Sequence, residues 1–324
     1  MLLKENKGKS DSLNIGINYC HGEYIVCIDA DSCLNNNAIS CIADIIKNHE
    51  DVEALGGSVI PKAGIFDYVF NSNYCFKDIL QSYQELEYGK AFNIVRTLFN
   101  KMDTTMLLSG TISIFKKDLL IELGSYSLDT VAEDMEIVMR IRQYIANTNK
   151  PLKISYVKDI ICYTEVPWNV SDLIKQRIRW TFGLYQVLWK YKEILYKDCY
   201  TFKEKITYCY YLLFELLSPF IELIGIVSIL LYDLTNTIIL LFVITLIIQI
   251  VLSIVGSYKS IKDSIELSKN KIKTIIKLSY LLISFVSIYH FVYSFVRLIS
   301  IPYYKIKNRN NNSNGNKWIS PKRK

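Results

Sequence analysis

The feature that most constrains this chain is a long run without a charged residue, from Leu234 to Tyr258. The run exceeds the roughly 20 apolar residues that an α-helix needs to cross a lipid bilayer. Hydrophobic residues make up 51% of the chain and charged residues 21%, which excludes a disordered protein. Because such a run is too apolar to remain in water, the sequence predicts a membrane protein.

Two further apolar segments lie on either side of this run. Ile206 to Tyr232 is apolar apart from two glutamates, and Leu278 to Val296 contains no acidic or basic residue except His290. Pro219 and the two glutamates make the first segment the one we expect to be broken or to lie along the membrane interface. The sequence therefore favours two full crossings over three.

Basic residues accompany the apolar segments. The linker between the second and third segments carries six lysines, and the tail 305–324 has seven basic residues and no acid. Basic residues next to membrane segments usually lie on the cytoplasmic side, so both the linker and the tail are predicted to be cytoplasmic. A chain that starts in the cytoplasm and crosses three times would instead end outside. Lipid headgroups account for these charges, and nothing indicates nucleic-acid binding.

Residues 1–200 have the pattern of a cytoplasmic α/β domain, followed by a transmembrane region, 201–304, and the basic tail, 305–324. Glu23 to Ile28 is a compact apolar run, which we interpret as a strand buried on both faces of a parallel sheet. A helix is expected over Asn37 to His49, then strands near Leu55 to Ile60 and Thr111 to Phe115, and a helix over Glu133 to Ile145. No apolar leader opens the sequence, and the eight cysteines form no Cys-x-x-Cys pair, as expected of a domain in the reducing cytoplasm.

Two carboxylates, Asp29 and Asp31, directly follow the first predicted strand. Ligands of open α/β sheets bind beyond the carboxyl ends of the strands, so both side chains are expected to face that crevice. Two carboxylates one residue apart can share a hard divalent cation, which neutralises a nucleotide diphosphate. The alternative is an ordinary turn, because aspartate is common at strand ends.

A second acidic pair, Glu133-Asp134, opens a predicted helix. The sequence from Thr130 to Glu133 fits a capping box, and acids at a helix N-terminus are stabilised by its free N–H groups. A cap requires only one carboxylate, however. The other can act as a general base that removes a proton from an attacking hydroxyl.

The third group of polar residues lies in a helical run from Ser171 to Leu195. Gln176, Arg179 and Trp180 share one face of that helix, which offers an amide, a guanidinium that can hold phosphate oxygens, and an indole that can stack on a sugar ring. An interfacial helix with Arg and Trp at the level of the lipid headgroups is the alternative.

Taken together and in this order, the three groups followed by membrane helices make the chain resemble the processive family 2 glycosyltransferases. That family contains the cellulose, hyaluronan and poly-N-acetylglucosamine synthases. Further agreement comes from Gly8-Lys9-x-x-x-Leu13-Asn14-x-Gly16, Leu108-Ser109-Gly110 and Thr164-Glu165-Val166-Pro167. The resemblance covers roughly residues 7 to 195 and implies a GT-A-like sheet with flanking helices.

The resemblance also implies a role for each polar residue. Asp29 and Asp31 would hold Mg²⁺ or Mn²⁺ and the donor diphosphate, with Asp31 the more direct ligand. Asp134 would deprotonate the acceptor hydroxyl, with inversion at the anomeric carbon, and Glu133 would lie beside it. The remaining residues would hold the diphosphate leaving group and the end of the growing polymer: Gln176, Arg179 and Trp180.

The implied function is transfer of a sugar, from a UDP-sugar, to a growing β-linked polysaccharide at the cytoplasmic face of the cell membrane by a multi-pass enzyme. The sequence departs from the family at Ala132, where many members have threonine, and at its start, where the family has nucleotide-binding strands. We therefore expect a missing N-terminal half, without which donor binding and polymer synthesis would be weak. The alternative function is a truncated, inactive remnant or partner of such a synthase.

Overall fold

The structure is a computed structural model, and it describes residues 5, 7–231 and 236–310. Its centre is a five-stranded sheet in the order β1-β4-β3-β5-β2. The strands are β1 (Tyr24–Ile28), β2 (Cys33–Leu34), β3 (Val52–Pro61), β4 (Ile112–Lys116) and β5 (Lys153–Thr164). β3 and β5 run parallel, and the other neighbours run antiparallel. The predicted α/β class with a mixed sheet is therefore confirmed.

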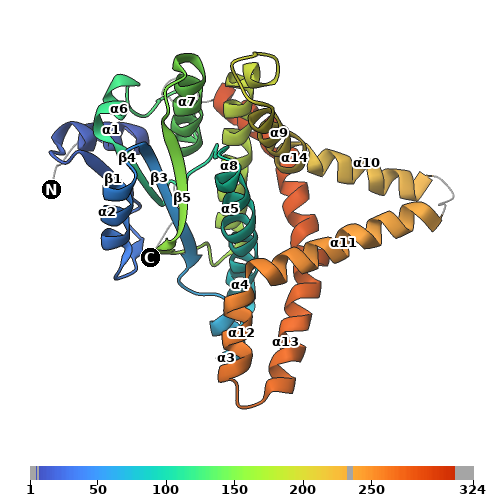
Figure 1. Ribbon diagram of the computed structural model, residues 1–324. Helices are drawn as coiled ribbons and strands as arrows, with labels where there is room; N and C mark the ends of the chain where they lie inside the picture. Colours follow the sequence, from blue (N-terminus) through green and yellow to red (C-terminus); the bar gives the residue numbers. More distant parts are fainter. Residues whose placement is uncertain (1–4, 6, 232–235, 311–324) are drawn as a thin grey trace.

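Helices cover both faces of this sheet (Figure 1). One face packs against α1 (Lys9–Tyr19), α6 (Lys117–Glu122) and α7 (Glu133–Thr148). The other face packs against α2 (Ala38–Asn48) and the π-helical stretch η1 (Gly89–Arg96). The two predicted helices, over Asn37 to His49 and Glu133 to Ile145, are confirmed as α2 and α7 within a few residues.

The first strand differs from its prediction. β1 pairs antiparallel with β4 and lies at an edge of the sheet, so its assignment to the interior of a parallel sheet was wrong. Ile25 and Cys27 are buried, whereas Val26 and Ile28 are exposed. All four side chains are apolar, so the sequence cannot reveal this alternation. Among the described strands, β4 is the only partner of β1.

A helical layer that the sequence did not predict joins the sheet to the apolar C-terminal region. It consists of α3 (Ile65–Phe70), α4 (Phe76–Tyr88) and α5 (Thr97–Lys101), together with η1. Side chains of α3 and α4 share one hydrophobic core with those of α13 (Lys271–Ser284) and η4 (Phe285–Tyr289). In addition, the Lys277 ammonium donates to the carbonyls of Tyr68, Val69 and Asn71, so this linker lysine binds protein backbone.

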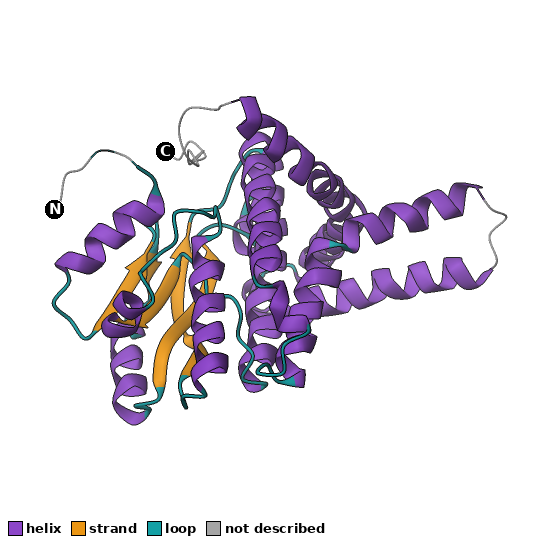
Figure 2. Cartoon of the chain, turned by 90° about the horizontal axis from the view of Figure 1, so that it is seen from above, coloured by secondary structure: helices purple, strands orange, loops and turns teal. Residues whose placement is uncertain are grey.

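The remaining helices follow the sheet in sequence. They are α8 (Val170–Lys190), η2 (Lys192–Leu195), α9 (Phe202–Tyr210), η3 (Tyr211–Leu216), α10 (Ser218–Leu231), α11 (Asn236–Gly256), α12 (Tyr258–Leu267) and α14 (His290–Asn310). Figures 1 and 2 both show α10 and α11 side by side, projecting away from the sheet. The connection between them, 232–235, and the tail from 311 lie outside the described residues.

One described helix is long and apolar enough to cross a membrane, Lys271–Tyr304, which has 34 residues and whose most apolar window has a mean hydropathy of 1.7. Two bent pairs also qualify if each is one span. The first pair bends by 51° between Leu216 and Ser218, next to Pro219, where the sequence predicts a broken segment. The second bends by 69° between Gly256 and Tyr258. By length and composition, the described part of the chain therefore has one to three candidate spans.

We expect the protein to stay with the membrane fraction after washing with high salt or alkaline carbonate. Helix Lys271–Tyr304 is longer than the roughly 20 residues of a span, and only a third of its most apolar window is buried in the protein. The measurement is an immunoblot of pellet and supernatant. Recovery of the chain in the carbonate supernatant without detergent would contradict the membrane prediction.

Candidate active site

The turn after β1 places Asp29 and Asp31 at one end of the sheet. The ends of two other strands hold this turn. The Lys62 ammonium, just after β3, donates to the Asp31 carbonyl at 2.7 Å. The Ser32 hydroxyl donates to the Thr164 hydroxyl, at the end of β5, at 2.8 Å. The turn is thus fixed by the sheet rather than freely exposed.

The start of α7 brings Glu133 and Asp134 to the same end of the sheet. One oxygen of Asp134, Oδ2, accepts a hydrogen bond from the Gly110 N–H at 2.9 Å, just before β4. The other, Oδ1, accepts from the Met135 N–H at 2.9 Å. Both hydrogen bonds come from backbone groups, so the Asp134 carboxylate is held in a fixed position.

The capping box predicted for this helix is wrong. The residue that caps α7 is Ala132, whose methyl side chain cannot accept a hydrogen bond. The Thr130 hydroxyl accepts from the Ala132 N–H at 3.1 Å instead, within the preceding loop. Glu133 therefore does not close a box with Thr130, and capping does not explain the second carboxylate.

Lys9, the first residue of α1, joins the two acidic pairs. Its ammonium lies 2.9 Å from Asp29 Oδ1 and 3.2 Å from Glu133 Oε1. It also donates to the Gly110 carbonyl at 3.3 Å. The Lys9, Asp29, Glu133, Asp134 and Gly110 groups, here called the Lys9 cluster, come from four segments that are far apart in the sequence.

The electrostatics of this cluster are those of a crowded acidic site. Burial, followed by the neighbouring Asp134 charge, raises the pKa of Glu133, and Lys9 opposes that rise. For Lys9 itself, burial disfavours the charge, but Glu133, Asp29 and Asp134 outweigh it and raise its pKa. Lys9 therefore remains an ammonium and keeps several like charges together.

Helix α8 carries the third predicted group. Gln176 is buried, with 6% of its surface exposed, whereas Trp180 is 38% exposed and Arg179 is intermediate. The helix touches the start of α7, because a side chain at Gly183 would meet the Ala132 Cβ at 2.6 Å. The Gln186 amide oxygen also accepts from the Val131 N–H at 3.1 Å. The structure thus places the three predicted residues on a helix that packs beside the Lys9 cluster, and not within that cluster.

One residue of this helix was not predicted to matter. Arg177 is 1% exposed, and its guanidinium pairs with Glu87 at 2.7 Å and donates to the Tyr289 hydroxyl at 3.3 Å. It also lies over the Trp180 ring, 4.3 Å from the centroid. Its place inside the Gln176–Trp180 motif could have drawn attention to Arg177. Its partners lie 90 and 112 residues away along the chain, so the sequence does not indicate them.

Lys9 and Gly110 were also given no role from the sequence. Both stand in short motifs that support the family resemblance, Gly8-Lys9 and Ser109-Gly110. The structure supplies the reason for the glycine, because a Cβ at Gly110 would lie 2.9 Å from the Lys9 ammonium and 3.1 Å from Asp134 Oδ2. A side chain at Gly110 would therefore displace the Lys9 ammonium or the Asp134 carboxylate from its place in the Lys9 cluster.

The carboxylates of Asp29 and Asp31 suit a hard divalent cation whose coordination is completed by oxygen atoms of the substrate. In the described part of the chain, no group of three or more His, Cys, Asp or Glu side chains is placed to hold a metal ion. Mg²⁺ and Mn²⁺ sites at phosphates, however, typically use one or two carboxylates, with phosphate oxygens and water supplying the rest. Asp29 and Asp31 fit that pattern.

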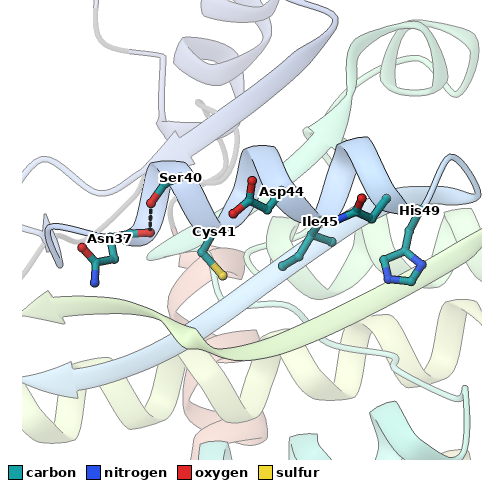
Figure 3. A pocket seen from close by; sticks show the side chains of 7 residues that line it. Asn37, Ser40, Cys41, Asp44, Ile45 and His49 are labelled. Atoms are coloured by element: carbon teal, nitrogen blue, oxygen red, sulfur yellow. Dashed lines mark hydrogen bonds between the residues drawn. The ribbon is translucent and has the colours of Figure 1, made fainter.

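A separate hollow of about 330 Å³ lies against the outer side of α2 (Figure 3). One helix and its two ends supply its lining: Asn37, Ser40, Cys41, Asp44, Ile45, Asn48 and His49. It includes none of the predicted site residues, which lie in the Lys9 cluster, in the turn after β1 and on α8.

Comparisons with known proteins identify several relatives of the chain. The poly-beta-1,6-N-acetyl-D-glucosamine synthase of Staphylococcus epidermidis is 27% identical over 214 residues, which are 66% of this chain and 46% of that protein. Its counterpart from Staphylococcus aureus is 26% identical over the same shares. The chain thus matches about half the length of these curated relatives.

A mannosyltransferase from Pyrobaculum calidifontis, solved with GDP-Man and Mn²⁺, superposes with a TM-score of 0.49 and 18% identity, over 85% of this chain and 68% of that one. The model of the glycosyl transferase family group 2 matches residues 24–256, which is more than half of the chain. The chain therefore belongs to the family 2 glycosyltransferases.

Proposed function

We propose that this chain carries the catalytic base, the metal ligands and the acceptor site of an inverting, metal-dependent glycosyltransferase. The enzyme transfers a sugar from a UDP-sugar to a growing β-linked polysaccharide. Residues 1–200 form the cytoplasmic catalytic domain, 201–304 anchor it in the cell membrane as a multi-pass region, and 305–324 form a basic tail. Family membership and the candidate membrane spans support this proposal.

The observation that carries the proposal is the position of Asp134. Its carboxylate is fixed by two backbone N–H groups at the start of α7, and its neighbour Glu133 shares the Lys9 ammonium with Asp29. A base must be held within hydrogen-bond reach of the proton it removes. The two backbone contacts of Asp134, and the Lys9 ammonium that joins Glu133 to Asp29, support this assignment.

In the proposed reaction, Asp134 accepts the proton of the acceptor hydroxyl as that oxygen attacks the anomeric carbon. The bond from that carbon to the diphosphate oxygen breaks, and the configuration inverts. Asp29 and Asp31 hold Mg²⁺ or Mn²⁺, which when bound supplies charge neutralisation to the departing diphosphate. Glu133 borders the acceptor, and its shared ion pair with Lys9 keeps it oriented.

Helix α8 supports the acceptor side of this proposal. Within the described residues, the buried amide oxygen of Gln176 has no hydrogen-bond partner. Buried polar atoms without a partner are rare and costly, and a hydroxyl of a polyhydroxylated guest would supply the missing partner. Trp180, on the same face of α8, offers an aromatic ring for stacking on a sugar. We assign Gln176, Arg179 and Trp180 to the leaving group and the polymer end.

The relatives suggest which donor to test first. Both are poly-beta-1,6-N-acetyl-D-glucosamine synthases, so UDP-N-acetylglucosamine is the proposed donor and a β-1,6-linked N-acetylglucosamine polymer the proposed product. The test measures radiolabel from UDP-N-acetylglucosamine, and from UDP-glucose in parallel, in polymer made by membranes that contain the chain. Label in polymer from neither sugar, although the chain is folded and inserted, would refute the enzyme proposal for the chain alone.

Asp31→Asn is expected to weaken Mn²⁺-dependent UDP binding at least tenfold, because the amide loses the charge that attracts a hard cation. UDP binding is measured by calorimetry with and without Mn²⁺. Asp44→Asn is the matched control, since Asp44 lies on α2 away from the Lys9 cluster. Equal Mn²⁺ dependence in Asp31→Asn and the parent would exclude Asp31 as a metal ligand.

A second function, that of a non-catalytic partner, is favoured by the open edge of β1, where Val26 and Ile28 are exposed. An unpaired apolar strand edge promotes pairing with another chain. Co-expression with the N-terminal segment of a relative separates the two functions. Polymer made only with that segment present means that the chain is one half of the enzyme, and no polymer in either case supports the partner.

A further inference from the structure

The ammonium of Lys9 occupies the point where the donor side and the acceptor side of the proposed site meet. Its partners are Asp29 at 2.9 Å on the donor side and Glu133 at 3.2 Å on the acceptor side. The Gly110 carbonyl accepts a third contact at 3.3 Å. With 23% of its side chain exposed, Lys9 is shielded enough for these charges to act strongly on one another.

The chain holds Lys9 in this position by its backbone. Gly8, before it, has a φ of 105°, in the left-handed region that glycine adopts readily. One turn further along α1, the Asn14 amide forms two hydrogen bonds with the backbone of Tyr126, at 2.9 and 2.8 Å. The helix that carries Lys9 is thus fixed to the loop before α7. This contact holds Lys9 in position beside Asp29 and Glu133.

A divalent cation and this ammonium need the same oxygen atoms. A cation shared by Asp29 and Asp31 uses the carboxylate of Asp29, whose Oδ1 already accepts from Lys9. Two positive charges within about 4–6 Å disfavour one another. Lys9 retains Glu133 and the Gly110 carbonyl when its contact with Asp29 weakens, so it can release one partner without becoming unpaired.

We propose that Lys9 is a positioning residue that acts as the internal counter-cation of the site and competes with the divalent cation for Asp29. Before donor binding it joins Asp29 to Glu133. When the divalent cation takes Asp29, the ammonium is left to Glu133, which orients the acceptor side. Metal binding without nucleotide is thereby kept weak. This inference rests on the proposed function, because it assumes that Asp29 and Asp31 are the metal ligands.

The test measures Mn²⁺ alone, without nucleotide, by the electron paramagnetic resonance signal of free Mn²⁺ in the presence of the purified full chain in detergent. Lys9→Met removes the charge and keeps much of the stem, and we expect it to bind Mn²⁺ about tenfold more tightly. Lys9→Arg keeps the charge and should remain within about twofold of the parent. Equal or weaker Mn²⁺ binding by Lys9→Met would overturn the proposal.

The matched control is Lys116→Met. Lys116 forms an ion pair with Glu53 at 3.2 Å, the same distance as the pair of Lys9 with Glu133, at the end of β4 opposite the cluster. Its Mn²⁺ affinity should equal that of the parent. A tenfold change in this control as well would mean that net charge acts on Mn²⁺ at a distance, which would also overturn the proposal.

A second pair of variants covers the case in which Lys9→Met does not fold because its acids lack a counter-charge. Lys9→Met combined with Glu133→Gln removes one charge of each sign and is compared with Glu133→Gln alone. Tighter Mn²⁺ binding by the double variant supports competition, and equal binding refutes it.

Failure of the proposed function gives a different result. If neither the parent nor Lys9→Met binds Mn²⁺, or if Asp31→Asn binds it as well as the parent, the metal site itself is wrong and the inference falls with it. If the parent binds Mn²⁺ through Asp31 while the Lys9 variants change nothing, only the inference about Lys9 fails.

Discussion

Asp134→Asn is expected to lower polymer synthesis by about 10²- to 10⁴-fold, the usual contribution of a general base. Asparagine has nearly the same shape, and its amide oxygen can still accept from the Gly110 N–H, which binds Asp134 at 2.9 Å. It cannot take up the hydroxyl proton, however. Because Asp134 is not among the proposed metal ligands, Mn²⁺-dependent UDP binding should remain close to that of the parent.

The measurement combines label incorporation from UDP-N-acetylglucosamine with calorimetry of UDP binding. It uses the chain alone or with the segment that restores synthesis. Asp129→Asn is the matched control, because this exposed carboxylate lies five positions before Asp134, outside the Lys9 cluster. Its rate should equal that of the parent. If Asp134→Asn turned over as fast as Asp129→Asn, Glu133-Asp134 would be a structural feature of α7 and not the base.

Local patterns in the sequence were sufficient for the elements that carry the site. The spacing of apolar residues on one helical face predicted both α2 and α7, and the apolar run before Asp29 predicted β1. These elements place Asp29, Glu133 and Asp134 at one end of the sheet. The order of the motifs was sufficient to predict the family, although the identity to the Staphylococcus epidermidis synthase is only 27%.

Contacts between distant segments were not predictable from the sequence. The inward and outward residues of β1 are all apolar, so the sequence does not indicate that β1 pairs antiparallel at the edge of the sheet. For this reason its predicted place in the sheet was wrong. Lys9 gives no local signal either, because its two carboxylates are 20 and 124 residues away along the chain. Only the fold brings these charges together.

The same holds for the connection between the catalytic domain and the apolar helices. Arg177 lies inside the Gln176–Trp180 motif, which was interpreted by the face that Gln176, Arg179 and Trp180 share. Arg177 falls on another face of the helix. In the structure it is buried against α4 and η4 through Glu87 and Tyr289. The helix that carries the proposed acceptor residues is thereby tied to the region proposed to enter the membrane.

That connection supplies the largest expected effect on stability. Glu87→Leu should destabilise the folded chain by about 3 kcal/mol or more, the usual result of leaving a buried charge without its partner. For Arg177, burial disfavours the charge, and the Glu87 carboxylate outweighs burial and raises its pKa. Without Glu87 the guanidinium, 1% exposed, keeps its burial cost and loses its 2.7 Å partner. The Tyr289 hydroxyl also loses its acceptor, at 2.9 Å.

The thermal midpoint of the detergent-solubilised protein, followed by circular dichroism, should fall by roughly 6 °C or more in Glu87→Leu. Asp51→Leu is the matched control, because it removes the acid of an ion pair with Lys153 whose side chains are 34% and 52% exposed. An exposed pair contributes at most about 1 kcal/mol, so this midpoint should move little. Equal shifts in the two variants would mean that burial does not determine how much the Arg177–Glu87 ion pair contributes to stability. A double variant, Glu87→Leu with Arg177→Met, should recover part of the loss, because no unpaired charge then remains in the interface.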